Sequence, residues 1–180
     1  MTSWIDSPVP HHEANVVFAR GIPRDELTRG LGDRLREPLA SGEGNGWVWA
    51  AHDMHNREKE DYGAVDYASM CPGGAEIVVF VTEPCSPKGF PPEFEYYRDG
   101  RLILCFSFED LQQRVGENPD YLSAELLAAH LIGPNRTCGF PDCPGDDCLD
   151  HFDVEHRLVE VITDAFSLPA PSLPPEVRAK

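Results

Sequence analysis

The residues best suited to chemistry lie in one stretch, CGFPDCPGDDCLDHFDVEH at 138–156. Cys138, Cys143 and Cys148 are each separated by four residues, and His151 follows Cys148 with two residues between them. Structural zinc sites use thiolates and imidazoles, with two to four residues between paired ligands in most cases. Three cysteines and one histidine would complete a closed tetrahedral set, which is typical of a structural rather than a catalytic site. Zinc is therefore the one cofactor that the sequence suggests.

Two other interpretations of these cysteines stay open. The cysteines are also compatible with inert thiols or with a redox pair. Aspartates surround them and add negative charge to a site that already carries thiolates: Asp142, Asp146, Asp147, Asp150 and Asp153. His156, eight residues after Cys148, is the alternative to His151 as the fourth ligand.

A second group that could do chemistry is His52, Asp53 and His55, directly after a predicted strand. A carboxylate that orients a histidine makes a usable general base. These residues, or the Cys138–Cys148 cluster, would serve the alternative function of a metal-assisted enzyme. The sequence contains no nucleophile elbow, phosphate-binding loop or dinucleotide fingerprint. Since no partner nucleophile is identifiable, we assign no catalytic residues and favour a satisfied polar role for both histidines.

The elements that must position these residues follow from hydrophobic periodicity and turn residues. Strands are predicted in ANVVFARGI at 14–22, WVWAAH at 47–52, AEIVVFVTE at 75–83 and a hairpin at 93–108. Helical patterns cover 23–32, 120–132 and 152–166. The hairpin turns at Asp99-Gly100, and the nearly continuous run AEIVVFVTE is typical of a central strand covered on both faces. REPLASGEGNG at 36–46 is predicted to be a loop, and Cys105 to lie in the core.

Together the elements predict an α+β fold. It is a single domain in which an antiparallel sheet includes the 93–108 hairpin and the helices pack on one face. The predicted organisation is a flexible N-terminus at 1–14, the domain at 15–168 with a Cys-rich loop at 138–150, and a Pro-rich tail at 169–180.

The net charge of −16 is unevenly distributed. Residues 1–40 carry 6 acids and 5 bases, residues 41–120 carry 15 and 6, and residues 121–180 carry 10 and 4. Phosphate contacts need clustered Lys and Arg, so this charge excludes nucleic acid as a partner and suits a basic protein. The sequence shows neither a signal peptide nor an apolar run of about 20 residues. We therefore expect a cytoplasmic protein, in which clustered thiols stay reduced.

Five short blocks carry a family resemblance: FARGI, ELTRGLG, GW, FEYYRDGRL and RVGENPDYL, in that order within residues 15–132. They resemble the signature blocks of a family of uncharacterised actinobacterial proteins defined by a domain of unknown function. The resemblance implies no activity, cofactor or catalytic residue. The Cys-rich stretch lies outside these blocks, so the zinc expectation depends on its own residues.

The sequence thus favours a small, acidic, intracellular protein-binding module. Such a module has no set of catalytic residues and could be of the immunity, inhibitory or regulatory type. Structural zinc would staple its last helix to the body through Cys138, Cys143, Cys148 and His151.

Overall fold

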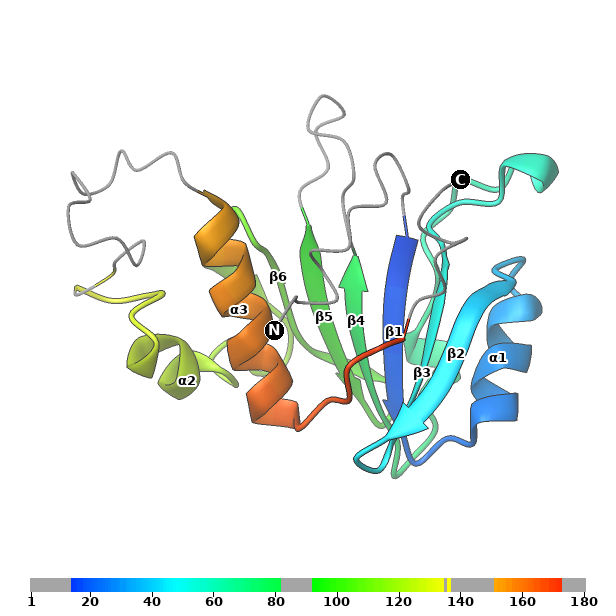
Figure 1. Ribbon diagram of the computed structural model, residues 1–180, viewed down its shortest axis with the longest axis horizontal. Helices are drawn as coiled ribbons and strands as arrows, with labels where there is room; N and C mark the ends of the chain where they lie inside the picture. The colour runs from blue at the N-terminus through cyan, green and yellow to red at the C-terminus, as the bar shows by residue number, and fades with distance from the viewer. Residues whose placement is uncertain (1–13, 82–91, 135, 137–150, 173–180) are drawn as a thin grey trace.

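The structure is a computed structural model that describes residues 14–81, 92–134, 136 and 151–172. Within these residues, seven strands form one antiparallel sheet in the order β2-β3-β1-β4-β5-β6-β7 (Figure 1). The strands are β1 Ala14–Arg20, β2 Pro38–Gly44, β3 Trp47–Asp53, β4 Glu76–Val81, β5 Glu93–Arg98, β6 Arg101–Ser107 and β7 Asp110–Val115. The prediction of an α+β fold with an antiparallel sheet is confirmed.

Three α-helices accompany the sheet in the described part of the chain: α1 Arg24–Gly32, α2 Ser123–Ala128 and α3 His151–Phe166. Two short 3-10 helices, η2 Arg57–Lys59 and η3 Ala68–Met70, lie between β3 and β4. In Figure 1, α3 crosses in front of the sheet and α1 lies beside β2. None of the described helices is long and apolar enough to cross a membrane.

The sheet has a buried core on each face because successive strand residues point to opposite sides. On β1, Val16 and Phe18 belong to the core that α3 covers with Leu158 and Ile162. We call this side the α3 face. Val17 and Ala19 of β1 belong instead to a second core, completed by α1 and Tyr67, on the side that we call the α1 face. The prediction that the helices pack on one face is therefore not confirmed, since α1 and α3 cover opposite faces.

The centre of the sheet matches the predictions. Ile77 and Val79 of β4 are buried on the α1 face, and Val78 and Phe80 on the α3 face, as expected of a strand covered on both sides. The predicted hairpin is formed by β5 and β6 around Asp99-Gly100, where both residues have positive φ. That combination is the two-residue turn that matches strand twist.

The predicted loop at 36–46 is wrong, because it contains β2, which pairs with β3 through an Asn45-Gly46 turn. The small residues of β2 are explained by close packing against the neighbouring strand, not by a loop conformation. A Cβ added at Gly42 would lie 2.7 Å from Nε1 of Trp49, so the indole occupies the space of a side chain. Sequence reasoning also missed β7, the edge strand that follows the hairpin.

Candidate functional site

The zinc ligands predicted at Cys138, Cys143 and Cys148 lie outside the described residues, as do residues 1–13 of the predicted flexible N-terminus and the end of the Pro-rich tail. Ala14, predicted to belong to that terminus, begins β1. His151 is the first residue of α3, one position before the predicted helix start, and its side chain also lies outside the description. Among the described residues, three polar regions are candidates for a functional site: one at Arg36, one at His52, and one at Glu93, Glu95 and Cys105.

The first region is organised by Arg36, which follows α1 and is only 2% exposed. Its guanidinium donates to the carbonyl oxygens of Met54 at 3.0 Å and Gly63 at 2.8 Å, and to the carboxylate of Asp61 at 3.0 Å. The hydrogen bond from Arg36 also lowers the pKa of Asp61. A buried charge needs such compensation. Arg36 therefore fastens the 54–63 segment to the end of α1.

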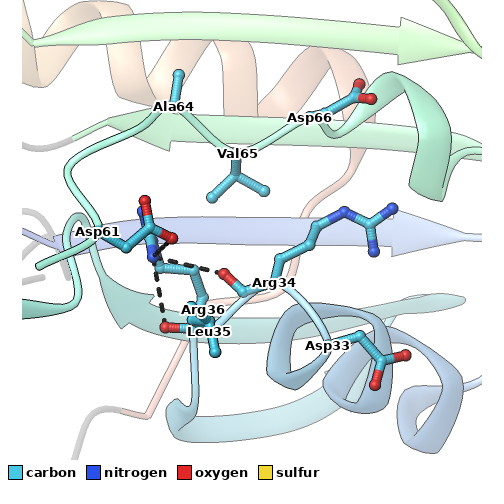
Figure 2. A pocket seen from close by; sticks show the side chains of 8 residues that line it. All are labelled: Asp33, Arg34, Leu35, Arg36, Asp61, Ala64, Val65 and Asp66. Atoms are coloured by element: carbon cyan, nitrogen blue, oxygen red, sulfur yellow. Dashed lines mark hydrogen bonds and ion pairs between the residues drawn. The ribbon is translucent and has the colours of Figure 1, made fainter. Parts of the chain in front are cut away.

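A pocket of about 340 Å³ opens beside this arginine (Figure 2). Its lining residues are Asp33, Arg34, Leu35, Arg36, Asp61, Ala64, Val65 and Asp66. Arg34 donates to the carbonyl oxygen of Gly30 at 2.9 Å and to Oγ of Ser69 at 2.6 Å. Both arginines thus have partners within the protein, and three aspartates remain at the wall.

Two large exposed apolar side chains belong to this region: Leu35 lines the pocket, and Tyr62 follows the lining residue Asp61 in the chain. Leu35 is 42% exposed and Tyr62 is 61% exposed, and the Tyr62 ring lies 5.7 Å from that of His55. Asp61 and Gly63, the neighbours of Tyr62 in the chain, both hold Arg36, which is itself the neighbour of Leu35. The bonds of Arg36 therefore tie the residues on both sides of Tyr62 to the segment that carries Leu35. We call Leu35, Tyr62 and the lining aspartates the pocket rim.

Leu35 also has left-handed backbone, with φ 59°. The Arg36 amide donates to the Leu31 carbonyl and the Leu35 amide to the Gly32 carbonyl, both at 2.9 Å. These two bonds form a Schellman motif, whose left-handed position is usually glycine. The chain places an exposed leucine where a glycine would fit without strain.

The second region contains the predicted His52, on the α1 face, where it is 0% exposed. Its Nδ1 donates to the backbone carbonyl of Asp53 at 2.8 Å, and its Nε2 accepts from the Tyr67 hydroxyl at 2.9 Å. The Asn15 side-chain amide donates to the same hydroxyl at 2.7 Å. Burial lowers the pKa of His52 to about 4, which agrees with this neutral tautomer. We call Asn15, His52 and Tyr67 the His52 network.

This geometry does not support the predicted general base. The backbone of Asp53, rather than its carboxylate, orients His52, and both ring nitrogens have partners inside the protein. His55 lies apart from the network against Tyr62, with a buried Nδ1 that has no hydrogen-bond partner. The structure does not bring His52, Asp53 and His55 together as one reactive group.

The third region is a cluster that sequence reasoning missed: Glu93 and Glu95 of β5 with Cys105 of β6, here called the Glu95 group. One ligand atom from each lies within 4.8 Å of the others, so the three could hold a metal ion. The Cys105 thiol donates to Glu93 at 2.9 Å, and the Tyr97 hydroxyl donates to Glu95 at 2.9 Å. Cys105 was predicted to lie in the core, but it is only partly buried.

The electrostatics of the Glu95 group disfavour charge in the absence of a cation. Burial, followed by the charge of Glu93, raises the pKa of Glu95 despite its hydrogen bond from Tyr97. Burial also raises the pKa of the Cys105 thiol, and the neighbouring Glu93 carboxylate raises it further. Alternation along β5 could have placed Glu93, Glu95 and Tyr97 on one face, but the cross-strand register was needed to add Cys105.

No protein-family model matches the chain, and no curated protein or solved structure matches it either. The resemblance to the actinobacterial family therefore stays a prediction, and the arguments for function come from the residues themselves.

Proposed function

We propose that this protein is a small acidic protein-binding module that captures a basic protein partner at the pocket rim and performs no catalysis. An immunity-type, inhibitory or regulatory role fits that activity. The observation that carries the proposal is Leu35, an exposed leucine in left-handed backbone at the edge of an acidic pocket.

Leu35 is unfavourable to the isolated protein in two ways. Left-handed backbone costs a residue with a Cβ atom about 1 kcal/mol, and glycine avoids that cost. Its side chain keeps 42% of its surface exposed, so part of the burial that would offset this cost is missing. Strained backbone in a surrounding structure that holds it firmly is typical of binding sites. A partner that covers Leu35 would recover the missing burial.

Tyr62 supplies the second contact of the proposed interface. Tyrosine is enriched among the residues that dominate binding energies, since it combines a large apolar area with a polar group. The residues on either side of Tyr62 are held by the bonds of Asp61 and Gly63 to Arg36. The backbone that carries the ring therefore has little freedom to lose on binding.

Charge selects the kind of partner. Asp33 and Asp66 are exposed at the pocket, whereas on the segment that Arg36 anchors the exposed Glu58 and Glu60 are balanced by the exposed Arg57 and Lys59. The whole chain carries −16, so its field attracts a basic protein and repels an acidic one. Such complementarity speeds association and weakens as salt rises.

The finer expectations from the sequence belong to the same proposal. The protein would act as a single domain in the cytoplasm, and Cys138, Cys143, Cys148 and His151 would bind structural zinc that pins α3 to the body. Elemental analysis of protein purified without added metal should find about one tightly bound zinc per chain that a Cys143→Ser variant loses.

The binding function can be tested with an affinity-tagged full chain and a cell lysate. A stoichiometric partner of basic composition should be captured, and its measured affinity should fall with increasing salt. Leu35→Gly and Tyr62→Ser should each weaken binding at least about tenfold, a loss of about 1.4 kcal/mol. Leu127→Ala, at an exposed leucine of α2, is the matched control and should leave affinity unchanged.

Leu35→Gly is the sharper variant because it should keep or slightly raise the stability of the fold. Weaker binding by a protein that is no less stable cannot come from unfolding. Equal affinities of the wild type, Leu35→Gly and Tyr62→Ser, or affinity that salt does not change, would refute the proposed interface.

A further inference from the structure

The register of the sheet brings the Glu95 group together. Glu95 of β5 is directly opposite Cys105 of β6, so their side chains project from the same face as neighbours. Glu93 is two residues before Glu95 and shares that face because strand side chains alternate. Three potential ligands therefore converge from two hydrogen-bonded strands, whose backbones hold them more firmly than a loop would.

The charge of these residues has no counterpart in the described part of the chain, where neither Glu93 nor Glu95 forms an ion pair with Arg or Lys. Glu76 provides the contrast at the other end of β4. It accepts hydrogen bonds from Tyr96 and from two arginines, Arg20 and Arg98. Burial alone would raise the pKa of Glu76, but these partners lower it overall. Among the described residues, no arginine or lysine pairs with the Glu95 group in the way that Arg20 and Arg98 pair with Glu76.

Tyr97 provides support from outside the group. Its hydroxyl donates to Oε2 of Glu95 at 2.9 Å, and its ring lies 6.2 Å from that of the buried Tyr67. A hydrogen bond that fixes one carboxylate oxygen leaves the other oriented for a ligand. Metal sites use such outer hydrogen bonds to hold their ligands in place.

We infer that Glu93, Glu95 and Cys105 form a binding site for a divalent cation of the zinc class. One thiolate and two carboxylates match the ligands that Zn²⁺ and Co²⁺ accept, whereas Mg²⁺ and Ca²⁺ prefer oxygen alone. Three protein ligands leave a fourth tetrahedral position for water or for a group from a partner. The site shares no residue with the four zinc ligands proposed in the Cys-rich stretch.

Binding must displace a proton. The S–H bond of Cys105 breaks, the proton passes to solvent, and the thiolate forms a bond to the cation while its hydrogen bond to Glu93 is lost. Apparent affinity should therefore rise about tenfold per pH unit while the free thiol stays protonated.

The test is titration of the chelator-treated full chain with Co²⁺, whose bond to a thiolate gives a charge-transfer absorption in the near ultraviolet. Wild-type protein should develop this band. In Cys105→Ser, the absorption from Co²⁺ bound at the Glu95 group should be lost. In Cys143→Ser, which alters the Cys-rich stretch, the same absorption should be retained. A band unchanged in Cys105→Ser, or no band in the wild type, overturns the inference.

Two further variants separate ligation from simple damage to the fold, which circular dichroism of each protein would report. Glu95→Gln preserves shape and can still accept from Tyr97, yet removes a charged ligand, and should weaken Co²⁺ binding at least about tenfold. Tyr97→Phe leaves all three ligands in place and should weaken it by about 10-fold, as loss of an orienting bond does elsewhere. Unchanged affinity in Glu95→Gln would also overturn the assignment.

Discussion

The His52 network and the Glu95 group lie on the same face of one sheet and are joined by the contact of Tyr67 with Tyr97. In each, a tyrosine hydroxyl donates to an ionisable side chain, to His52 at 2.9 Å and to Glu95 at 2.9 Å. In each, burial shifts the pKa toward the uncharged form, lowering that of His52 and raising that of Glu95.

The His52 network and the Glu95 group differ in whether the uncharged side chains have all their hydrogen-bond and charge partners within the protein. Neutral His52 uses one ring nitrogen as donor and the other as acceptor, so the network is complete without any ligand. The Glu95 group keeps two carboxylates and a thiol together with one outside donor. A polar residue on a sheet face can thus have a purely structural role or be available to bind a ligand. Which of the two applies depends on whether negative charge is left without a partner.

The largest expected effect is the pH dependence that His52 contributes. Unfolded His52 takes up a proton near pH 6.5, while folded His52 stays neutral down to about pH 4. Its contribution to stability is therefore fully present above pH 6.5 and is lost as pH falls through about 4. The shift corresponds to about 3 kcal/mol. Urea unfolding between pH 7 and 4 measures this loss.

His52→Gln is the comparison for that experiment. The variant keeps every carboxylate but cannot titrate at position 52, so its stability should fall less steeply over the same pH range. Parallel curves for the two proteins would show that His52 is charged, or accessible, in the folded state.

The next effect is the loss of one hydroxyl from each region. Tyr67→Phe leaves the buried amide of Asn15 and Nε2 of His52 without partners and should destabilise the fold by about 2 kcal/mol. Tyr97→Phe removes a bond to a half-buried carboxylate that water can reach and should cost less than about 1 kcal/mol. Urea denaturation of both variants at pH 7 measures the difference. Equal losses would mean that the two regions are equally closed.

The centre of the sheet could be predicted because its signals are local. The apolar run of β4 and the Asp99-Gly100 turn are written in consecutive residues. The edges were missed for physical reasons. The glycines of β2 resemble a loop, although Gly42 is small to admit Trp49 from the next strand. The Asn45-Gly46 turn carried a hairpin signal that the composition of β2 obscured.

The candidate sites were predicted less well because they depend on register and on which face is covered. His52 was considered as a general base, with a satisfied polar role favoured, but the sequence pattern does not show that the ring is buried against the Tyr67 hydroxyl. Cys105 was assigned to the core because its strand is apolar. Only the pairing with β5 shows that it meets Glu95 where the face is partly open.

The smallest effect should be a gain, from Glu95→Gln. The raised pKa of Glu95 means that the folded protein favours the protonated carboxyl group. The contribution of Glu95 to stability therefore falls as the pH rises from its pKa in the unfolded chain, about 4.5, through its higher pKa in the folded protein. At pH 7 without metal, the neutral amide should raise stability by up to about 1 kcal/mol, the scale of charge pairs on a sheet face. Added Zn²⁺ should reverse the order, because wild-type protein gains binding energy that the variant lacks. Thermal unfolding with chelator and with Zn²⁺ measures both. A variant that is less stable than wild type in chelator would place Glu95 with His52, as a polar residue whose role is purely structural.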